Sequence, residues 1–359
     1  MDLGILSLSD LQVDPVTGRR QDPGRRVQDI VSYGILADRL GLDVVALGEH
    51  HTLDFAVSSP AVTLAAIAQG TRRIRLSSGV SVISALDPVR LHEDFAGLDL
   101  LSGGRAEIIA GRSAFVEPFD LFDVDLQHYD EIFAEKLDLL LQLRRSERVT
   151  WSGAYRPALR DAQIAPRPAQ DELPVWVGVG GSPQSAMRAG RLGLPMMLGL
   201  IGGDVRGARA ITDLYRRTAA KAGAPAAGTR LGVTSHLYIA ETSQQAIDTF
   251  FPYYRQYSRP RGRDRSWAID RDGFDTLAGP HGAMAVGSPA QVIDKLLLAH
   301  DTLDLDRFLG QVDLGGLPSS LVRRSIELFA TEVAPAVRSA LATRTTYRAR
   351  ERETFRLLP

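Results

Sequence analysis

The chain contains 359 residues, of which 44% are hydrophobic and 24% are charged, and this composition is typical of a soluble globular protein. Its 42 basic and 43 acidic residues give a formal net charge of -1, so the basic surplus that holds nucleic acid is absent and we expect no nucleic-acid partner. The absence of cysteine excludes disulfides, a thiolate nucleophile and iron–sulfur clusters, which means that any redox chemistry must use a bound cofactor.

The sequence predicts neither a signal peptide nor a membrane span. Residues 1–5 lack the basic start and the apolar core of a secretory signal. The longest nearly apolar stretch, Gly193–Gly203, is well short of the ~20 residues that cross a bilayer. We therefore expect a cytoplasmic protein without membrane contact.

Short apolar runs rich in β-branched residues alternate with helical patterns along the chain, and this alternation predicts βαβ units around a parallel sheet. Because no Gly-x-Gly-x-x-Gly fingerprint follows the first run, a closed (β/α)8 TIM barrel is favoured over an open doubly wound sheet. The eight predicted strands are Leu3–Leu8, Asp43–Leu47, Ile74–Val82, Ala106–Ala110, Leu173–Val179, Leu194–Leu198, Leu231–Ile239 and Asp306–Gln311.

Several helix ends follow from capping residues. Gly41 is placed to stop the first helix, and Ser182-Pro183 is placed to start another, which Gly190 or Gly193 would end. Thr242 and Ser288 each precede a Gln by three residues, which is the spacing of a capping box.

Two connections are longer than a minimal barrel requires. Arg144–Glu172 follows the fourth strand and Gly199–Gly228 follows the sixth, and insertions at such places commonly shape the mouth of an active site. We assign residues 1–342 to a single barrel domain. Residues 343–359, with five Arg and two Glu, form a basic tail that we expect to be exposed or to contact a partner.

Active sites of such barrels lie at the carboxyl ends of the strands. The second strand ends in Gly48-Glu49-His50-His51, and a histidine there can donate or accept a proton near neutral pH. An alternative is that Glu49 and one histidine only hold the loop through hydrogen bonds. A metal site would need ligands from other strand ends, where only His128 and His236 are loosely suitable, so we expect no metal.

The third strand carries Ser77 and Ser78, followed by Gly79-Val80. A glycine at this point permits close approach of a ligand or of another backbone segment, although a simple β-bulge would also explain it. The sequence leaves both interpretations open.

Two further strand ends suggest a phosphate site. Arg112-Ser113 follows the fourth strand, and a guanidinium suits a two-pronged grip on phosphate or carboxylate. The fifth strand runs through Gly180-Gly181-Ser182 into a helix that carries Ser185, and the free N–H groups of such a helix start bind anions. These residues predict a phosphorylated ligand, which an aldolase or a sugar-phosphate enzyme would also bind.

None of the three lysines, Lys136, Lys221 and Lys295, follows a strand, which disfavours a Schiff-base mechanism.

Four collinear motifs resemble the bacterial luciferase-like monooxygenase family: Leu47-Gly48-Glu49-His50-His51, Asp87-Pro88-Val89-Arg90-Leu91-His92-Glu93-Asp94, Leu98-Asp99-Leu100-Leu101-Ser102-Gly103-Gly104-Arg105 and Gly193-Leu194-Pro195-Met196. The resemblance extends from the first strand to about Met197 and more loosely to Ala336. It implies a (β/α)8 barrel, a flavin cofactor that is most often FMN and in some members a deazaflavin, and a homodimer formed through the helices near the second and third strands.

The resemblance also implies roles for individual residues. His50 is similar to the histidine that supports flavin oxygen chemistry, and Gly79-Val80, with Ser78 before it, falls where a non-proline cis peptide lies beneath the flavin ring. Arg112 matches the arginine that holds the FMN phosphate, and the adjacent Ser113 is expected to contact the cofactor as well. The other phosphate contacts are matched by Gly180, Gly181, Ser182 and Ser185. Two departures matter: the reactive cysteine of luciferase is absent, and its acidic residue at the phosphate site is Gly181 here, so light emission is not implied.

The function expected from this resemblance is a flavin-dependent monooxygenase that uses reduced FMN and O2 on a small organic substrate, with the reduced FMN delivered by a separate flavin reductase. Leu200, Ile201 and Phe115 would give the substrate apolar walls. The alternatives are hydride transfer with a deazaflavin, whose anionic tail would need basic residues such as Arg206 and Arg209, and FMN binding without turnover.

Overall fold

A closed barrel of parallel strands forms the centre of the molecule. The computed structural model describes residues 1–113, 115–225, 228–259 and 268–344. Neighbouring strands pair in the order β1-β2-β3-β5-β8-β9-β10-β12, and β12 pairs again with β1, so the sheet closes on itself. The barrel strands are β1 (Asp2–Ser7), β2 (Val44–Leu47), β3 (Arg75–Ser78), β5 (Ala106–Gly111), β8 (Val175–Val179), β9 (Met196–Gly199), β10 (Leu231–Ile239) and β12 (Arg307–Asp313).

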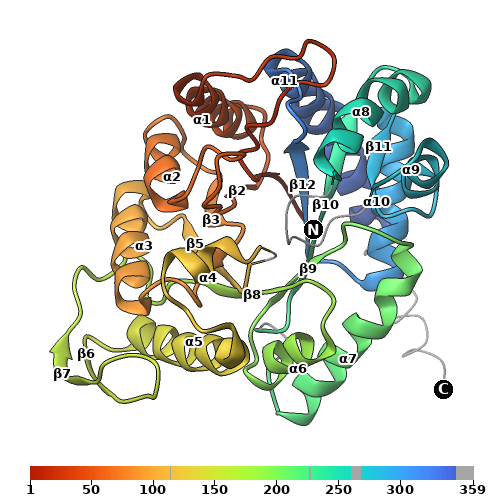
Figure 1. Ribbon diagram of the computed structural model, residues 1–359. Coiled ribbons are helices and arrows are strands. Elements are labelled where there is room, and N and C mark those ends of the chain that lie inside the picture. Colours follow the sequence, from red (N-terminus) through yellow and green to blue (C-terminus); the bar gives the residue numbers. More distant parts are fainter. Residues whose placement is uncertain (114, 226–227, 260–267, 345–359) are drawn as a thin grey trace, which may run out of the picture.

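Helices surround this barrel, and Figure 1 looks into its mouth with the helices arranged around the strands. The predicted TIM barrel is confirmed, and each of the eight predicted strands is present, Leu231–Ile239 with the predicted bounds and the others with one or both ends shifted. The helices are α1 (Pro23–Arg39), α2 (Pro60–Gln69), α3 (Pro88–Ser102), α4 (Glu117–Leu121), α5 (Tyr129–Arg145), α6 (Pro183–Arg191), α7 (Arg209–Lys221), α8 (Ser243–Tyr257), α9 (Arg271–Ala278), α10 (Pro289–Leu303) and α11 (Ser319–Leu328).

The strands are apolar because both of their faces are covered, one by the helices and the other by the barrel interior. Inside, residues from successive strands form a compact cluster. Its members are Leu6, Val44, Ala46, Ile109, Trp176, Met197 and Leu309. Outside, a larger apolar core joins the strands to the helices. The mouth is thereby the part of the barrel in which polar residues can meet a ligand.

The helix ends largely follow the predicted caps. The side chains of Ser182, Thr242 and Ser288 each accept a hydrogen bond from the backbone N–H three residues later. Gly41 follows the end of α1 with φ +83°, and Gly193, with φ +63°, follows α6, so Gly193 rather than Gly190 ends that helix. Among the described residues, no helix is long and apolar enough to cross a membrane.

The predicted third strand, Ile74–Val82, is interrupted. It consists of β3 and the short β4 (Ser81–Val82), and the non-proline peptide bond Gly79–Val80 between them is cis, as expected. β3 and β4 pair with successive parts of β5. β4 therefore continues the path of β3 along β5, with Gly79 and Val80 at the interruption between them.

The connections after the strands differ in size. The one after β5 holds α4, the 3-10 turn η1 (Leu126–His128), α5 and an antiparallel hairpin, β6 (Arg148–Trp151) with β7 (Leu159–Gln163). The one after β9 holds a second 3-10 turn, η2 (Val205–Ala208), and α7. The connection after β10, residues 240–306, holds α8 and α10, whose starts were predicted, together with α9 and the extra strand β11 (Ala285–Gly287), which were not. β11 pairs with Leu237–Ile239 at the carboxyl end of β10.

At the carboxyl end of the chain, α11 continues through a π-helical turn (Phe329–Val333) into helical residues 334–344. The predicted tail thus starts inside this helix at Thr343. From residue 345 onward it lies outside the described residues.

Candidate active site at the barrel mouth

A ledge formed by Gly79 and Val80 lies at the mouth between β3 and β4. The Val80 side chain packs onto Gly111 of β5 and Gly178 of β8, where a Cβ would clash with it; on Gly178 the Cβ would lie 2.9 Å from a Val80 methyl. A Cβ on Gly79 would lie 2.7 Å from the Leu6 side chain. These glycines let two neighbouring strands approach Val80 closely, and Gly79 and Val80 stay half-buried and accessible.

The hydroxyl of Ser78 does not take part in this ledge. It is fully buried, accepts a hydrogen bond from the N–H of Ile109 at 3.0 Å and donates to the carbonyl of the same residue at 3.3 Å. Ser78 thus joins β3 to β5 through its hydroxyl. The cofactor contact expected of Ser78 stays a prediction.

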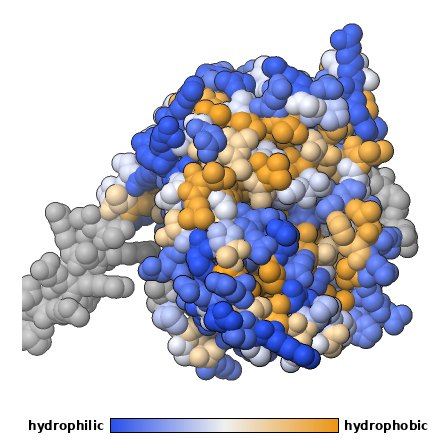
Figure 2. Space-filling model, turned by 90° about the vertical axis from the view of Figure 1, so that its left-hand side faces the viewer, coloured by the Kyte–Doolittle hydropathy of each residue, from blue (hydrophilic) through white to orange (hydrophobic). Residues whose placement is uncertain are grey.

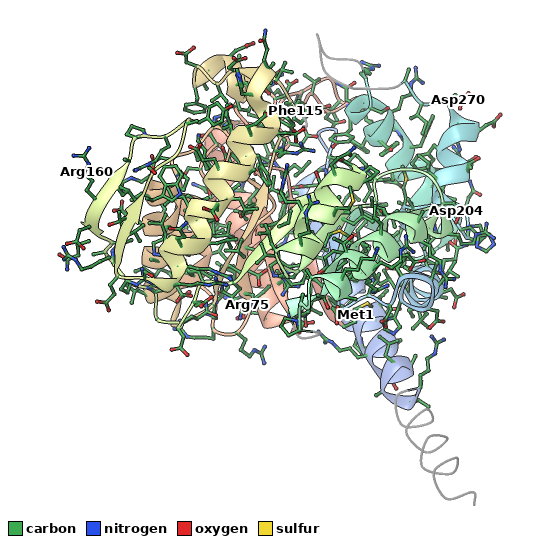
Figure 3. The ribbon with its side chains drawn as sticks, turned by 90° about the horizontal axis from the view of Figure 1, so that it is seen from below. Met1, Arg75, Phe115, Arg160, Asp204 and Asp270 are labelled. Atoms are coloured by element: carbon green, nitrogen blue, oxygen red, sulfur yellow. The ribbon has the colours of Figure 1, made fainter. Side chains whose placement is uncertain are left out.

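His50 stands beside the ledge, just after β2. Its ring stacks on Phe55 with centroids 3.9 Å apart and meets Phe115 edge-on at 5.0 Å. Figure 3 shows Phe115 at the mouth, at the opposite end of the barrel from Arg75 and Met1. His50 is half-buried, so two aromatic rings orient its imidazole and part of it remains open to the mouth.

The neighbours of His50 have a structural role. Glu49 is buried, its Oε1 pairs with Nε2 of His51 at 3.0 Å, and its Oε2 accepts the Val82 N–H at 2.9 Å. These contacts tie the loop after β2 to β4. The alternative interpretation therefore applies to Glu49 and His51, whereas His50 is the imidazole presented to the mouth.

The predicted phosphate residues converge at the start of α6. Arg112 donates from Nη2 to the Ser185 hydroxyl at 2.9 Å and pairs through Nη1 with Asp130 of α5. Its guanidinium also lies over the Tyr129 ring, 4.6 Å from the centroid. Ser182 caps α6, and its hydroxyl accepts a hydrogen bond from the Ser185 N–H at 3.4 Å.

The glycines and Ser113 complete this turn. Gly181 has φ +101°, a left-handed conformation that favours glycine, and nothing lies within 4 Å of a Cβ built on Gly180 or Gly181. Ser113 follows Arg112 with φ +57°, and its hydroxyl accepts the Phe115 N–H at 3.0 Å. The turn thus leaves open space in front of the helix start, while Ser113 shapes the loop that carries Phe115.

Arg188 was missed by the sequence analysis. It lies one turn after Ser185 on α6, its guanidinium stacks 5.1 Å from the Phe133 ring centroid, and its Nη2 is 3.7 Å from Asp130. Its Nη1 is buried without a hydrogen-bond partner in the described structure. Burial and the nearby charge of Arg112 lower the pKa of Arg188. The three-residue spacing from Ser185 was the available signal, because it places both side chains on one face of α6.

These residues fit a phosphorylated flavin. The guanidiniums of Arg112 and Arg188 face a single carboxylate, that of Asp130, and with the dipole of α6 they leave a net positive charge at this site. The buried Nη1 of Arg188 is a hydrogen-bond donor that an anion would satisfy. The ledge presents half-buried Gly79 and Val80 at the mouth, with the Val80 side chain seated on Gly111 and Gly178. A phosphate and a planar ring can thus be held at one mouth.

Comparison with known proteins identifies the family. The luciferase-like monooxygenase family matches residues 1–305. The chain belongs to this family. Its membership confirms the resemblance on which the site residues were selected, and it makes this luciferase-like protein an oxidoreductase.

Named relatives fall into two groups. The 4-hydroxyprotoasukamycin monooxygenase of Streptomyces nodosus subsp. asukaensis is 25% identical over 92% of this chain and 92% of its own length. An F420-dependent glucose-6-phosphate dehydrogenase of Amycolatopsis mediterranei is 29% identical over 67% of this chain and 70% of its own. Among solved structures, monooxygenase RslO1 from Streptomyces bottropensis superposes with a TM-score of 0.81 at 26% identity, covering 93% of this chain and 99% of that one.

Proposed function

We propose that this protein is a flavin-dependent monooxygenase that uses reduced FMN and O2 on a small organic substrate. The observation that carries the proposal is the convergence of Arg112, Ser185 and Arg188 on the start of α6, at the same barrel mouth as the glycine-backed ledge and His50. Arg112, Ser185 and Arg188 would bind a phosphate, and a planar ring would lie against the ledge beside His50.

Most of these residues would bind the flavin, and His50 would take part in the chemistry. Arg112, Arg188 and the N–H groups at the start of α6 would hold the phosphate of FMN. The ledge would support the ring, and Phe55 and Phe115 would keep water away from it. A bound reduced flavin supplies the electrons that activate O2. His50 would hold or move a proton at the reacting atoms through its imidazole.

Hydride transfer with a deazaflavin is the second candidate, favoured by the F420-dependent relative. The basic residues expected for its anionic tail are already paired: Arg206 with Asp204 at 2.6 Å and Arg209 with Asp213 at 3.6 Å. Around this end of α7, the described side chains give no surplus of positive charge, so we place FMN first. FMN binding without turnover is the third candidate.

Stopped-flow absorbance tests the first of these three functions. The protein is mixed anaerobically with reduced FMN and then with oxygenated buffer, beside a matched run with free reduced FMN. We expect the protein to delay the appearance of oxidised FMN absorbance, and Arg112→Ala to abolish the delay at the same flavin concentration. Oxidation at the rate of free FMN would contradict the proposal.

The source of the reduced FMN is a separate flavin reductase in this proposal. An assay that couples the protein to a generic NADH-dependent flavin reductase should show substrate-dependent oxygen consumption. A binding protein without turnover would instead bind FMN tightly and consume no extra oxygen with any substrate.

A further inference from the structure

A cavity of about 520 Å³ lies beside the phosphate turn, on the side of α6 that faces α7. This volume falls within the range of small-molecule sites, roughly 300–1,000 Å³. Its walls are apolar, from Leu198 and Leu200 at the end of β9 and from Ile211 and Leu214 on α7. Gly181, which also belongs to the phosphate turn, lines it, so the cavity borders the phosphate turn.

The cavity is open in front of its glycines and framed by fixed backbone. Nothing lies within 4 Å of a Cβ built on Gly181, Gly202 or Gly207. The wall between them is held by backbone hydrogen bonds from Val205 to His281 at 3.2 Å and from Ala283 to Gly203 at 2.9 Å. A flat group could thus enter without displacing side chains from these positions.

The charges at the cavity rim are balanced. Asp204 lines the cavity, and hydrogen bonds from the Arg206 side chain and backbone, strengthened by the Arg206 charge, lower the pKa of Asp204 to about 2. Arg209 pairs with Asp213. Among the described residues of the rim, each arginine therefore has a carboxylate partner. Such a neutral, apolar cavity suits an uncharged ring better than a chain of carboxylates.

We propose that this cavity accepts the adenosine of flavin adenine dinucleotide, so that the protein binds FAD as well as FMN. The first phosphate of FAD, which FMN also carries, lies at Arg112 and Ser185. The second follows the Gly181 turn at the start of α6, and the adenosine lies against Leu200 and Ile211. The assignment rests on the proposed flavin function and extends it to the cofactor range.

The test is a set of fluorescence titrations with FMN, FAD, riboflavin and a deazaflavin. Ala210, which lines the cavity, is changed in Ala210→Phe to fill it, and Ala220→Phe adds the same ring on the exposed end of α7 as the matched control. We expect wild-type protein to bind FAD within about threefold of FMN, and Ala210→Phe to weaken FAD at least about tenfold with FMN unchanged. Ala220→Phe should change neither, and Arg112→Ala should weaken both. Gly207→Leu, at an open position, serves as a second filling variant.

Each result that differs from these expectations overturns a stated part of the proposal. FAD binding more than about tenfold weaker than FMN in wild type, or an equal loss of both in Ala210→Phe, overturns the adenosine assignment and leaves FMN binding intact. Deazaflavin binding that is tighter than FAD and lost in Ala210→Phe makes the cavity the site of the deazaflavin tail and overturns the assignment. Failure of every flavin to bind overturns the proposed function and the assignment together.

Discussion

At the scale of single residues, His50 is the side chain on which the proposed chemistry depends most directly. Phe55 and Phe115 orient its ring, and it stays half-buried at the mouth. We expect His50→Ala to lower substrate-dependent turnover by roughly 10²- to 10⁴-fold, because a positioned proton donor or acceptor contributes about that much. Oxygen consumption with reduced FMN measures the effect. Leu53→Ala, at an exposed position of the same loop, is the control, and unchanged turnover in His50→Ala would remove the role from this residue.

Arg188 gives a prediction that separates phosphate binding from ring binding. Its buried Nη1 has no partner in the described structure, and a phosphate oxygen would provide one. Because hydrogen bonds to charged groups contribute about 1.5–3 kcal/mol, Arg188→Leu should weaken FMN binding on the order of 10- to 100-fold. Riboflavin, which has no phosphate, should bind the variant and the wild type equally. A parallel loss of riboflavin binding would indicate a folding defect instead.

At the same scale, most residues selected from the sequence are those that follow strands, and Ser185 was selected because it lies in the first turn of α6. His50 and Arg112 could be predicted because ligands of such barrels meet the carboxyl ends of the strands. Asp130 and Arg188 lie within α5 and α6, and their approach to Arg112 depends on how these helices pack against each other. The bonds of the Ser78 hydroxyl to the neighbouring strand could not be predicted for a related reason, since no local pattern indicates them.

At the scale of secondary-structure elements, four strands meet in an ionic layer at the amino-terminal end of the barrel. Glu107 of β5 and Arg307 of β12 form a buried pair, with Arg75 of β3 and Asp2 of β1 on either side. Arg307 also lies over the Trp176 ring at 4.4 Å. Because Glu107→Gln removes the fully buried carboxylate and leaves the buried Arg307 with only the part-exposed Asp2, it should lower the free energy of unfolding by about 3–5 kcal/mol. Urea denaturation measures it, with Glu93→Gln in an exposed pair as control.

The same pair sets a pH dependence. Burial alone would raise the pKa of Glu107, but the guanidiniums of Arg307 and Arg75 outweigh it and hold that pKa below the ordinary 4.5. The unfolded chain therefore binds the proton first, so the stabilisation is complete above about pH 4.5 and is lost as pH falls through the lower folded value. The gap in stability between wild type and Glu107→Gln should be constant near neutral pH and narrow below about pH 4.5. A constant gap down to pH 3 would contradict this.

The elements themselves were largely predictable, because the barrel strands are buried on both faces and read as continuous apolar runs. The interruption at Gly79–Val80 was expected only through family resemblance, since Ile74–Val82 reads as one strand. In the connection after β10, the elements β11 and α9 were missed because β11 spans only three residues and α9 eight, too short for a clear period. The strand β11 can pair here because β10 extends beyond its pairing with β9.

At the scale of the whole molecule, α2 and α3 expose apolar side chains on one side of the barrel. Val62 of α2 is 70% exposed, and Leu100 and Leu101 of α3 are 51% and 59% exposed. Figure 2 looks at the side that carries these helices and shows apolar residues gathered across it. Exposed apolar patches on soluble proteins commonly mark protein interfaces. We propose that a second copy of the chain covers this side in a homodimer.

Light scattering after size exclusion tests this proposal. Wild-type protein should have twice the 39.1 kDa mass of one chain, because burying Val62, Leu100 and Leu101 in a symmetric contact removes the same patch from water on both copies. Val62→Lys combined with Leu101→Lys should shift the mass toward one chain, since each charge would be desolvated twice in a two-fold interface. Leu121→Lys, at a similarly exposed residue of α4, should leave the mass unchanged. A wild-type monomer at micromolar concentration, or a dimer that persists in the double variant, would place the interface elsewhere or exclude it.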